Sequence, residues 1–384
     1  MKLNYKLGEL IRNIDVKNKD LHCNNLKGLS MTKEFRASTS NIVGTDLSKY
    51  KIVAYKQFAC DFMSAIRVHK MPIAFNSEME EILVSPAYAV FEVIDENIIL
   101  PEYLMMWFRR SEFDRYADFR SDAAIRGGYG WNELCETEIK LPSLEEQRKK
   151  VQAYKTITDR IELKKKINDN LVATLQIIYK KMFLESQNTY ITKPLADLCS
   201  KIGSGATPKG GKAAYFDKGI SLIRSMNVFD YFFSYPELAH ISQIQANALA
   251  NVEIQQADVL FNITGVSVTR CCVVPDDVLP ARVNQHVMII RPYKGKNMSY
   301  YIMCTLCTSE NKAKLLGIGQ SGSTREAINK QELERFEIPV PSDEELERFG
   351  EIATKIYALI FSNTNEIRML CDMKDTLLTK LSSY

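Results

Sequence analysis

One stretch of this chain occurs twice, and the second copy lies 199 positions after the first. The run "EIKLPSLEEQRKKV" begins at Glu138, and the run "EIPVPSDEELERFG" begins at Glu337. Each copy ends a short apolar segment with Pro, Ser and acidic residues and then opens a long helical pattern. An internal repeat of this kind means that the chain builds two similar units, so a single undivided core for the 384 residues is excluded.

The repeated helical segments have the pattern of coiled-coil helices. Apolar residues recur every three or four positions, without Pro or Gly, from Leu144 to Met182. The second copy runs from about Asp343 to Leu381, with Asn363 near the apolar stripe. A helix of about 40 residues is roughly 60 Å long and must bury its stripe against a partner, for which its own copy is the obvious choice. The interface residues predicted on these helices are Leu144, Glu145, Glu146, Ile161, Leu171, Leu175, Ile178, Ile356, Ile367, Leu370 and Leu377.

The two helical segments carry opposite net charge. Residues 145–181 hold ten Lys or Arg against five Asp or Glu, whereas residues 343–384 hold five against eight. Opposite charge favours pairing of the two helices with each other over pairing of each with a second copy of itself. The alternative is that each helix covers the surface of its own domain.

The segments that precede the helices have a different sequence pattern. Residues 1–142 and 188–341 alternate short strand-like runs with Gly, Ser and Pro turns, and each segment contains a helical piece near its end. The sequence therefore predicts two globular α+β domains, 1–142 and 188–341, which are followed by two spacer helices, 143–187 and 342–384.

Composition places the chain in a broad class. The formal net charge of +3 is close to zero, so the overall charge does not indicate nucleic-acid binding. The first residues lack the apolar core of a signal peptide, and no apolar run is long enough to cross a membrane. Nine cysteines without an export signal are best explained as reduced thiols. We therefore expect a cytoplasmic protein of several domains.

The loop "GSGATPKGGKAAYF", from Gly203 to Phe216, combines several glycines with two lysines, a threonine and a tyrosine. It resembles a phosphate-binding P-loop in its glycine spacing, but Gly211 stands where that motif needs Lys, and Pro208 interrupts it. Nucleotide binding is therefore disfavoured. Two lysines, a threonine and a tyrosine on a flexible loop suit contacts with DNA phosphates and bases, although an ordinary turn is as good an explanation for any single residue.

Further polar residues follow strand-like runs in the second half. The runs "LFNITGVSVTR" and "ARVNQHVMIIRP" end in Asn, Gln and Arg, whose side chains make bidentate contacts with adenine and guanine edges. Asn and Gln at strand ends are also common turn formers. Two small-residue loops that bear Arg, "RSDAAIRGGYGW" and "GQSGSTREAI", occupy equivalent places just before the two repeats.

Motifs for catalysis are not recognisable. The pair "CTLC", Cys304 to Cys307, has the spacing of a zinc ligand pair but lacks a second pair and reads as a buried helix face. His69, His240 and His286 stand without an evident Asp or Cys partner. An Asn-Pro-Pro-aromatic run and a Gly-rich S-adenosylmethionine loop are both absent from the sequence. We therefore predict no metal, no cofactor and no catalytic residue in this chain.

These segments together resemble one known family, the specificity (S) subunits of Type I restriction-modification enzymes. The similarity is carried by "SGATPKGG", "DVLFNITGVSVTRCCVVP", "VNQHVMIIRP", "GQSGSTREAINKQELERFEIPVPSDEE" and "KLPSLEEQRKKV". In the first half, "GLSMTKEFRAS" and "LVSPAYAVFEV" are similar to one subtype of the family. The DNA-binding residues predicted from all these segments are Lys33, Arg36, Arg120, Arg126, Tyr129, Ser204, Thr207, Lys209, Lys212, Tyr215, Arg224, Asn227, Thr264, Arg270, Asn284, Gln285, Ser321, Ser323 and Arg325.

The resemblance implies an architecture and a set of partners. Two target-recognition domains would be separated by two long antiparallel coiled-coil helices, with pseudo-twofold symmetry, and each domain would read one half of a split site in double-stranded DNA. Two modification (N6-adenine methyltransferase) subunits would dock along the helices and bring S-adenosylmethionine, and two restriction (ATP-dependent motor-nuclease) subunits can join the same assembly. The chain itself would be a non-catalytic recognition subunit.

Two other classes of function stay open at the level of sequence. One is a self-contained DNA-modifying enzyme, which would label or cut DNA without partners. The other is a coiled-coil scaffold whose domains bind only protein, which would not shift random duplex DNA in a gel. The recognised bases and the spacer length are not encoded in any readable pattern.

Overall fold

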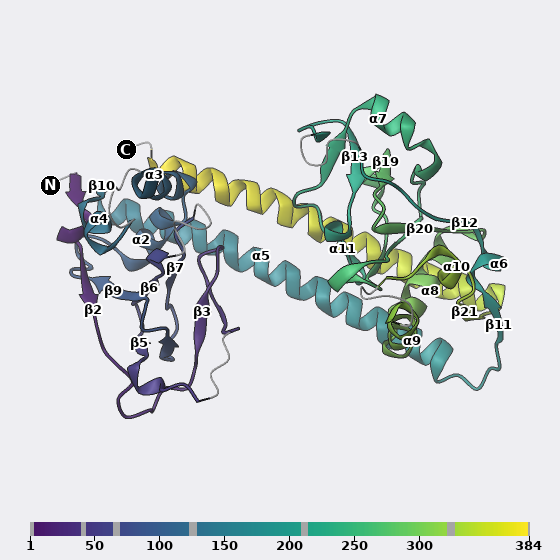
Figure 1. Cartoon of the computed structure of the whole chain (residues 1–384), viewed down its shortest axis with the longest axis horizontal. Coiled ribbons are helices and arrows are strands. Elements are labelled where there is room, and N and C mark those ends of the chain that lie inside the picture. Colours follow the sequence, from purple (N-terminus) through teal and green to yellow (C-terminus); the bar gives the residue numbers. More distant parts are fainter. Residues whose placement is uncertain are drawn as a thin grey trace. The chain divides into compact units, whose positions relative to one another are not determined.

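The computed structural model describes residues 4–39, 44–63, 70–122, 129–208, 214–320 and 327–382. The chain divides into two compact units. Unit 1 is Met1–Leu163 together with Ile367–Tyr384, and unit 2 is Lys164–Glu366. Each unit holds a globular α+β part, here called its head, and a portion of both long helices (Figure 1). None of the helices in the described ranges is long and apolar enough to cross a membrane.

The head of unit 1 is built around a four-stranded antiparallel sheet with the strand order β2-β9-β6-β7. Three two-stranded ribbons, β1-β10, β3-β4 and β5-β8, surround this sheet. The elements are β1 (Asn4–Lys6), β2 (Ile11–Ile14), β3 (Lys27–Leu29), β4 (Phe35–Ala37), β5 (Lys51–Val53), β6 (Phe58–Cys60), β7 (Ile73–Phe75), β8 (Ile82–Val84), β9 (Ala89–Val93), α2 (Pro101–Phe108), α3 (Ser111–Asp122), α4 (Trp131–Glu136) and β10 (Glu138–Lys140).

The head of unit 2 has a four-stranded antiparallel sheet of order β12-β20-β17-β18 and a three-stranded sheet, β16-β13-β19, in which β13 and β19 are parallel. Two ribbons, β11-β21 and β14-β15, complete it. The elements are β11 (Ile191–Pro194), α6 (Leu195–Leu198), β12 (Cys199–Ser204), β13 (Ile220–Ile223), β14 (Val228–Phe229), β15 (Phe232–Phe233), β16 (Ala239–Ile241), α7 (Gln243–Ala248), β17 (Val259–Asn262), β18 (Cys271–Val273), β19 (Ala281–Val283), β20 (Val287–Pro292), α8 (Gly295–Leu306), α9 (Ser309–Gln320), α10 (Lys330–Glu334) and β21 (Glu337–Val340).

The repeat seen in the sequence extends to the order of elements that closes each head. In unit 1 the last strand of the four-stranded sheet is followed by α2, α3, α4, β10 and the long helix α5 (Leu144–Tyr179). In unit 2 the equivalent strand is followed by α8, α9, α10, β21 and the long helix α11 (Asp343–Thr379). The predicted α+β class with two long helices is confirmed. A π-helical turn, Lys180–Leu184, extends α5.

The Pro-Ser-acidic element of each repeat is a helix start. In the first copy, the backbone N–H of Ser143 donates to Glu146 at 3.2 Å, and the N–H of Glu146 donates to the Ser143 hydroxyl at 3.3 Å. In the second copy, Ser342 and Glu345 make the same two bonds at 3.0 and 3.3 Å. This reciprocal capping satisfies backbone donors that would otherwise lack a partner in the first turn, and so it ends the strand and begins the helix at a defined residue.

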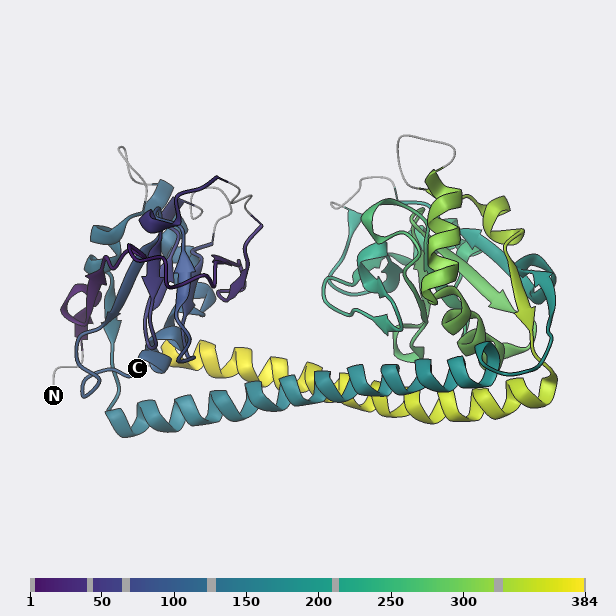
Figure 2. The ribbon, with the colours of Figure 1, turned by 90° about the horizontal axis from the view of Figure 1, so that it is seen from below.

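Within unit 2 the portions of α5 and α11 lie side by side and run antiparallel (Figure 2). Lys164 of α5 contacts Glu366 of α11 at 2.9 Å. At the other end of this portion, the rings of Tyr179 and Phe349 lie 6.0 Å apart, so residue numbers rise along α5 as they fall along α11. Of the interface residues predicted from the sequence, Ile161, Leu175, Ile356 and Leu370 are buried, whereas Leu144, Leu171, Ile178, Ile367 and Leu377 are half-buried and Glu145 and Glu146 are exposed.

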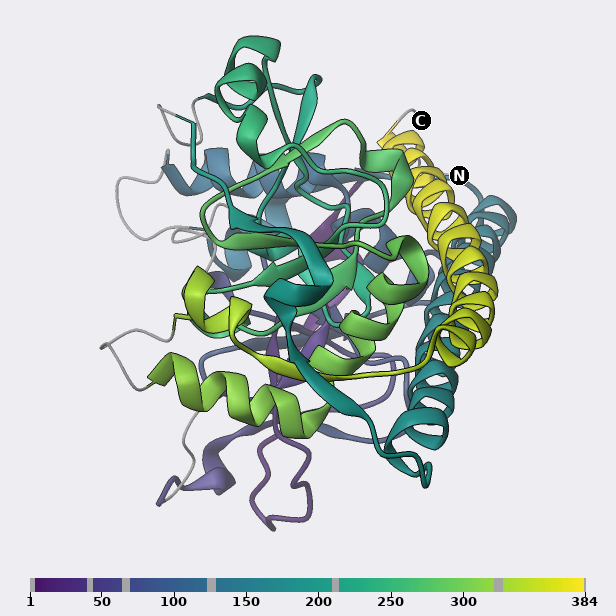
Figure 3. The same ribbon diagram turned by 90° about the vertical axis from the view of Figure 1, so that its right-hand side faces the viewer.

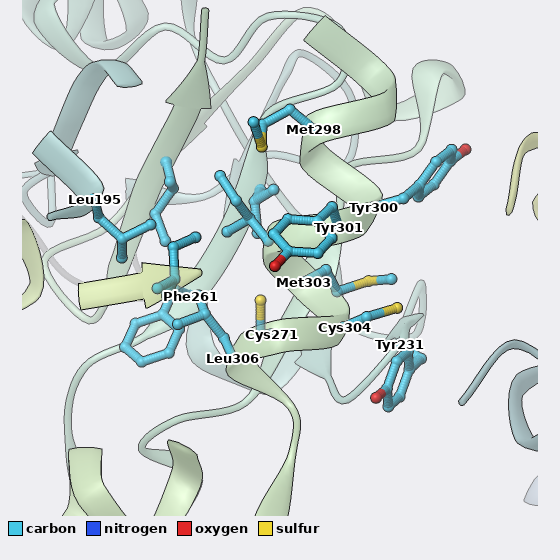
Figure 4. Packing of buried hydrophobic residues seen from close by; sticks show 14 of the residues in the cluster. Leu195, Tyr231, Phe261, Cys271, Met298, Tyr300, Tyr301, Met303, Cys304 and Leu306 are labelled. Atoms are coloured by element: carbon cyan, nitrogen blue, oxygen red, sulfur yellow. The ribbon is translucent and has the colours of Figure 1, made fainter. Parts of the chain in front are cut away.

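The head of unit 2 packs on its helices through α8. Tyr301 and Met303 of α8 are fully buried in one core with Phe261 and Cys271 of the four-stranded sheet (Figure 4). The hydroxyl of Tyr179, on α5, shares a hydrogen bond of 2.9 Å with Thr305. Aromatic and hydroxyl contacts of this kind hold the helix surface firmly against the head. Figure 3 shows the helices along one side of this head.

Unit 1 anchors its head to α5 with a buried amide. Gln147 is fully buried and donates to the carbonyl groups of Ile98 and Pro142, at 3.0 and 3.1 Å, while its own carbonyl accepts from the N–H of Leu100. The equivalent residue of the second repeat is Leu346, which is buried in the apolar core of unit 2. At this equivalent position, unit 1 therefore packs its head on the long helix through hydrogen bonds, whereas unit 2 uses apolar contacts.

Candidate nucleic-acid interface

Polar residues from three separate segments meet at one end of the four-stranded sheet of unit 2. The hydroxyl of Thr207, which follows β12, donates to the side-chain carbonyl of Gln285, which precedes β20. The amide nitrogen of Gln285 lies 3.2 Å from Nε2 of His286, and Nδ1 of His286 lies 2.7 Å from the hydroxyl of Thr264, which follows β17. We call Thr207, Gln285, His286 and Thr264 the loop network.

The order of donors in the loop network follows from its chemistry. The Gln285 amide can only donate, so Nε2 of His286 must accept and Nδ1 must carry the proton that it donates to Thr264. The hydroxyl hydrogen of Thr264 and the second amide hydrogen of Gln285 are then not used within the loop network. Donors presented by a sheet end and its loops match the acceptor atoms on purine edges in DNA.

Close backbone packing places Thr207 within reach of Gln285. The N–H of Gly205 donates to the carbonyl of Asn284 at 3.1 Å. A Cβ atom at position 205 would lie only 1.8 Å from the carbonyl oxygen of Val283. Only glycine permits this approach, which explains why a Gly-rich segment stands here without being a phosphate-binding loop.

This close approach gives a matched pair of substitutions. We expect Gly205→Ala to lower the free energy of unfolding of unit 2 by about 1–3 kcal/mol, because a main-chain oxygen must move. Gly203→Ala is the control, since a Cβ atom there meets nothing within 4 Å. Urea unfolding measures both variants. Equal stability of the two would show that the 205–283 contact is not formed in solution.

The turn between β17 and β18 is tightly held. Asn262 is fully buried and donates to the carbonyl groups of Ser225 and Val228 at 2.9 and 3.3 Å. The N–H of Thr269 donates back to the carbonyl of Asn262 at 2.9 Å. At the end of this turn, the guanidinium of Arg270 lies 4.6 Å from the centre of the Phe229 ring. Stacking on an aromatic ring restricts the guanidinium plane while its N–H donors stay in reach of a partner.

The remaining predicted residues of unit 2 divide by burial. Asn227 and Asn284 are buried and form turns: Asn227 accepts from the N–H of Arg224 at 3.0 Å, and Asn284 accepts from the N–H of His286 at the same distance. Their predicted contact with DNA bases is at odds with this burial. The guanidinium of Arg224 donates to the carbonyl of Glu237 and lies 5.4 Å from the ring of the half-buried Tyr215. Ser204 is half-buried beside a cavity of about 490 Å³ that Thr264 also lines.

The predicted residues of unit 1 that lie in the described ranges differ in burial. Lys33 is buried and contacts Asp114 at 2.8 Å, and burial lowers the pKa of its ammonium group. Tyr129 is buried, its hydroxyl shares a 2.8 Å hydrogen bond with Thr137, and burial raises its pKa. Direct DNA contact by either residue does not fit these positions. Arg36 is exposed and donates to the carbonyl of Leu29 at 3.1 Å, and Arg120 is exposed on α3.

Six predicted residues lie outside the described ranges, so their positions carry no argument: Arg126, Lys209, Lys212, Ser321, Ser323 and Arg325. His286 is a residue that the sequence did not single out as part of a site, because a histidine next to a turn has no local signal for its partners. Among the described residues, no group of three or more His, Cys, Asp or Glu could hold a metal ion. Cys304 is buried in α8.

Comparison with known proteins agrees with this picture. Residues 192–369 match the family described as the Type I restriction modification DNA specificity domain. The chain is 21% identical over 309 residues to the Type I restriction enzyme MjaIX specificity subunit of Methanocaldococcus jannaschii, which covers 75% of this chain and 70% of that protein. It is 26% identical over 114 residues to the Type I restriction enzyme HindI specificity subunit of Haemophilus influenzae, with 29% and 24% covered.

The fold has a relative among solved structures. The crystal structure of a Type-I restriction-modification system S subunit from M. genitalium superposes with a TM-score of 0.54 at 12% identity, over 98% of this chain and 95% of that chain. The matched domain, residues 192–369, begins in β11 and ends in α11. The curated relatives that the chain resembles are specificity subunits of Type I restriction enzymes, and its residues 192–369 match the specificity domain.

Proposed function

We propose that this chain is the non-catalytic subunit that selects the DNA sequence for a Type I restriction-modification complex. Each head would read one half of a bipartite site in double-stranded DNA. The observation that carries the proposal is the loop network of Thr207, Gln285, His286 and Thr264, which lies in a head whose closing order of elements occurs twice in the chain. Two related heads that differ in their loops fit two different half-sites.

The partners supply the chemistry in this proposal. Two modification subunits would dock along α5 and α11 and bring S-adenosylmethionine for N6-adenine methylation, and two restriction subunits would complete the nuclease. The relatives named above are specificity subunits, which supports a role inside such an assembly. The purified chain alone should shift duplex DNA that contains its site and should transfer no methyl group to it. Methyl transfer by the chain alone would contradict the proposal.

The long helices give this proposal a measurable consequence. We expect one inserted heptad in α5 near Ile161, matched by one in α11 near Leu370, to lengthen the spacer between the half-sites by about three base pairs. Seven residues of helix add about 10.5 Å, and one base pair of DNA rises about 3.4 Å. Both half-sequences should stay the same, because the heads are untouched.

Long-read mapping of methylated adenines in a host that carries the variant measures this outcome. A matched control exchanges Ile161 and Leu370 for Leu and Ile without changing helix length. An unchanged spacer in the lengthened variant would show that the helices do not set the distance between the half-sites.

A further inference from the structure

A group of polar side chains interrupts the apolar seam between α5 and α11. Asn168 and Asn363 are buried, with 5% and 8% of their surfaces exposed, and Nδ2 of Asn363 donates to the side-chain carbonyl of Asn168 at 2.9 Å. Nζ of Lys164 donates to the side-chain carbonyl of Asn363 at 2.9 Å and pairs with Glu366 at 2.9 Å. Asn168 also lies 3.4 Å from the hydroxyl of Thr364. We call these five residues, all in unit 2, the polar layer.

The polar layer satisfies itself only in one alignment of the two helices. The Asn363 side chain uses both its donor and its acceptor within the layer. If either helix slid along the other, these buried amides would face apolar side chains and lose their partners, at a cost of the order of 1–3 kcal/mol for each unpaired group. Apolar residues at the same positions would tolerate several alignments, which is why one buried Asn in a coiled coil specifies its register.

The place of the polar layer along the helices is also informative. The core of unit 2 takes α5 residues from Leu171 onward and α11 residues up to Ile360. The core of unit 1 takes α5 residues up to Tyr154 and α11 residues from Leu377 onward. Each head therefore packs on both helices at its own end, and the polar layer lies in the stretch where neither core includes residues of α5 or α11.

The sequence repeat shows why this position is special. Lys164 and Asn363 are 199 residues apart, which is the offset of the repeat, and they are in contact. At the polar layer, therefore, residues at equivalent positions of the two repeats contact each other. Here one copy carries a lysine and the other an amide, and Glu366 balances the lysine, so the pairing is specific for one helix with the other.

We propose that the polar layer fixes the register of α5 against α11 and thereby the spacer length that the protein accepts between its half-sites. This inference rests on the proposed function. A slip of one heptad would change the span by about 10.5 Å, or roughly three base pairs. The residues of the layer are positioning residues, since none of them needs to touch DNA.

The decisive variant replaces both amides, as Asn168→Leu with Asn363→Leu. Two leucines should pack in the seam, so the melting temperature is expected to stay the same or rise by several degrees. The spacer ratio is the yield of methylation at the native spacing divided by the yield at spacings three base pairs longer or shorter, measured with the assembled modification complex. We expect this ratio to fall at least about tenfold. Ile161→Leu with Leu370→Ile, which alters the seam but keeps the layer, should leave the ratio unchanged.

A charge reversal provides a second, independent test. Lys164→Glu should lower the spacer ratio because it places two carboxylates together, and the addition of Glu366→Lys should restore the ratio. A merely structural role would move the melting temperature of these variants without moving the ratio. If the double leucine variant folds and keeps the wild-type ratio, or if it fails to fold and charge reversal leaves the ratio unchanged, the inference is overturned. A wild-type chain that accepts every spacing would instead refute the proposed function.

Discussion

Replacement of Arg270 by alanine is expected to reduce discrimination at one base pair of the half-site read by unit 2 by about 5- to 150-fold. This range corresponds to the roughly 1–3 kcal/mol that a bidentate contact between arginine and a guanine edge contributes. The guanidinium is held over the ring of Phe229 at 4.6 Å, at the end of a turn whose other end carries Thr264. The dissociation constant of the cognate duplex and of duplexes altered at each position, at one salt concentration, measures the effect.

Two further variants separate the possible roles of Arg270. Arg270→Lys keeps the charge but loses the planar fork, so it should lose most of the discrimination and keep the salt dependence. Lys193→Ala removes an exposed cation from β11 and should leave base discrimination intact. If Arg270→Ala weakens binding equally on all duplexes, the residue contacts phosphate and the assignment to a base edge is wrong.

Replacement of Lys33 by methionine is expected to lower the free energy of unfolding of unit 1 by about 3–5 kcal/mol, because it leaves a carboxylate without its buried partner. Lys33 lies at the tip of the β3-β4 ribbon with a left-handed backbone, φ 62°, and its ammonium group contacts Asp114 at 2.8 Å and donates to the carbonyl of Phe108. Asp114 also accepts from the N–H of Met71 at 3.1 Å. Removal of the charge therefore disturbs three segments at once. Hydrogen exchange of the unit 1 amides measures the loss.

The matched control is Lys19→Met, which removes an exposed lysine from the same unit. The double variant Lys33→Met with Asp114→Leu should recover much of the loss, because a buried ion pair can be exchanged for apolar side chains at little cost. If Lys33→Met behaves like Lys19→Met, the side chain is exposed in solution, and its predicted contact with DNA becomes tenable.

The fold was predictable from the sequence because its main determinants are local and repeated. The capping residues Ser143 and Ser342 lie at the predicted ends of the strands, and the apolar spacing after them gives both helices. The polar layer was only partly visible. Asn363 lies near the apolar stripe in the sequence, but Asn168 carries no sign of burial until the partner helix is known, because helix register depends on contacts distant in sequence.

The site was harder to predict for the same reason. The sequence predicts Thr207, Thr264 and Gln285 individually but not the histidine that joins them. His286 is adjacent to Gln285 in sequence, whereas its second hydrogen bond is with Thr264, which follows a different strand. Asn227 and Asn284 are predicted from residue type alone, and their side-chain oxygens accept hydrogen bonds within the chain's own turns. A side chain able to read a base edge is equally able to pair with a backbone, and only burial distinguishes the two uses.

The ribbons β1-β10 and β11-β21 have a consequence for the exchange of a whole head. Asn4 pairs with Lys140, and Ile191 pairs with Val340, so each head enters and leaves the helical frame through neighbouring antiparallel strands. We expect that a foreign head with matching first and last strands can be exchanged between these points without altering the path of the chain on either side. Under the proposed function, such an exchange would bring a new half-site while α5 and α11 stay the same.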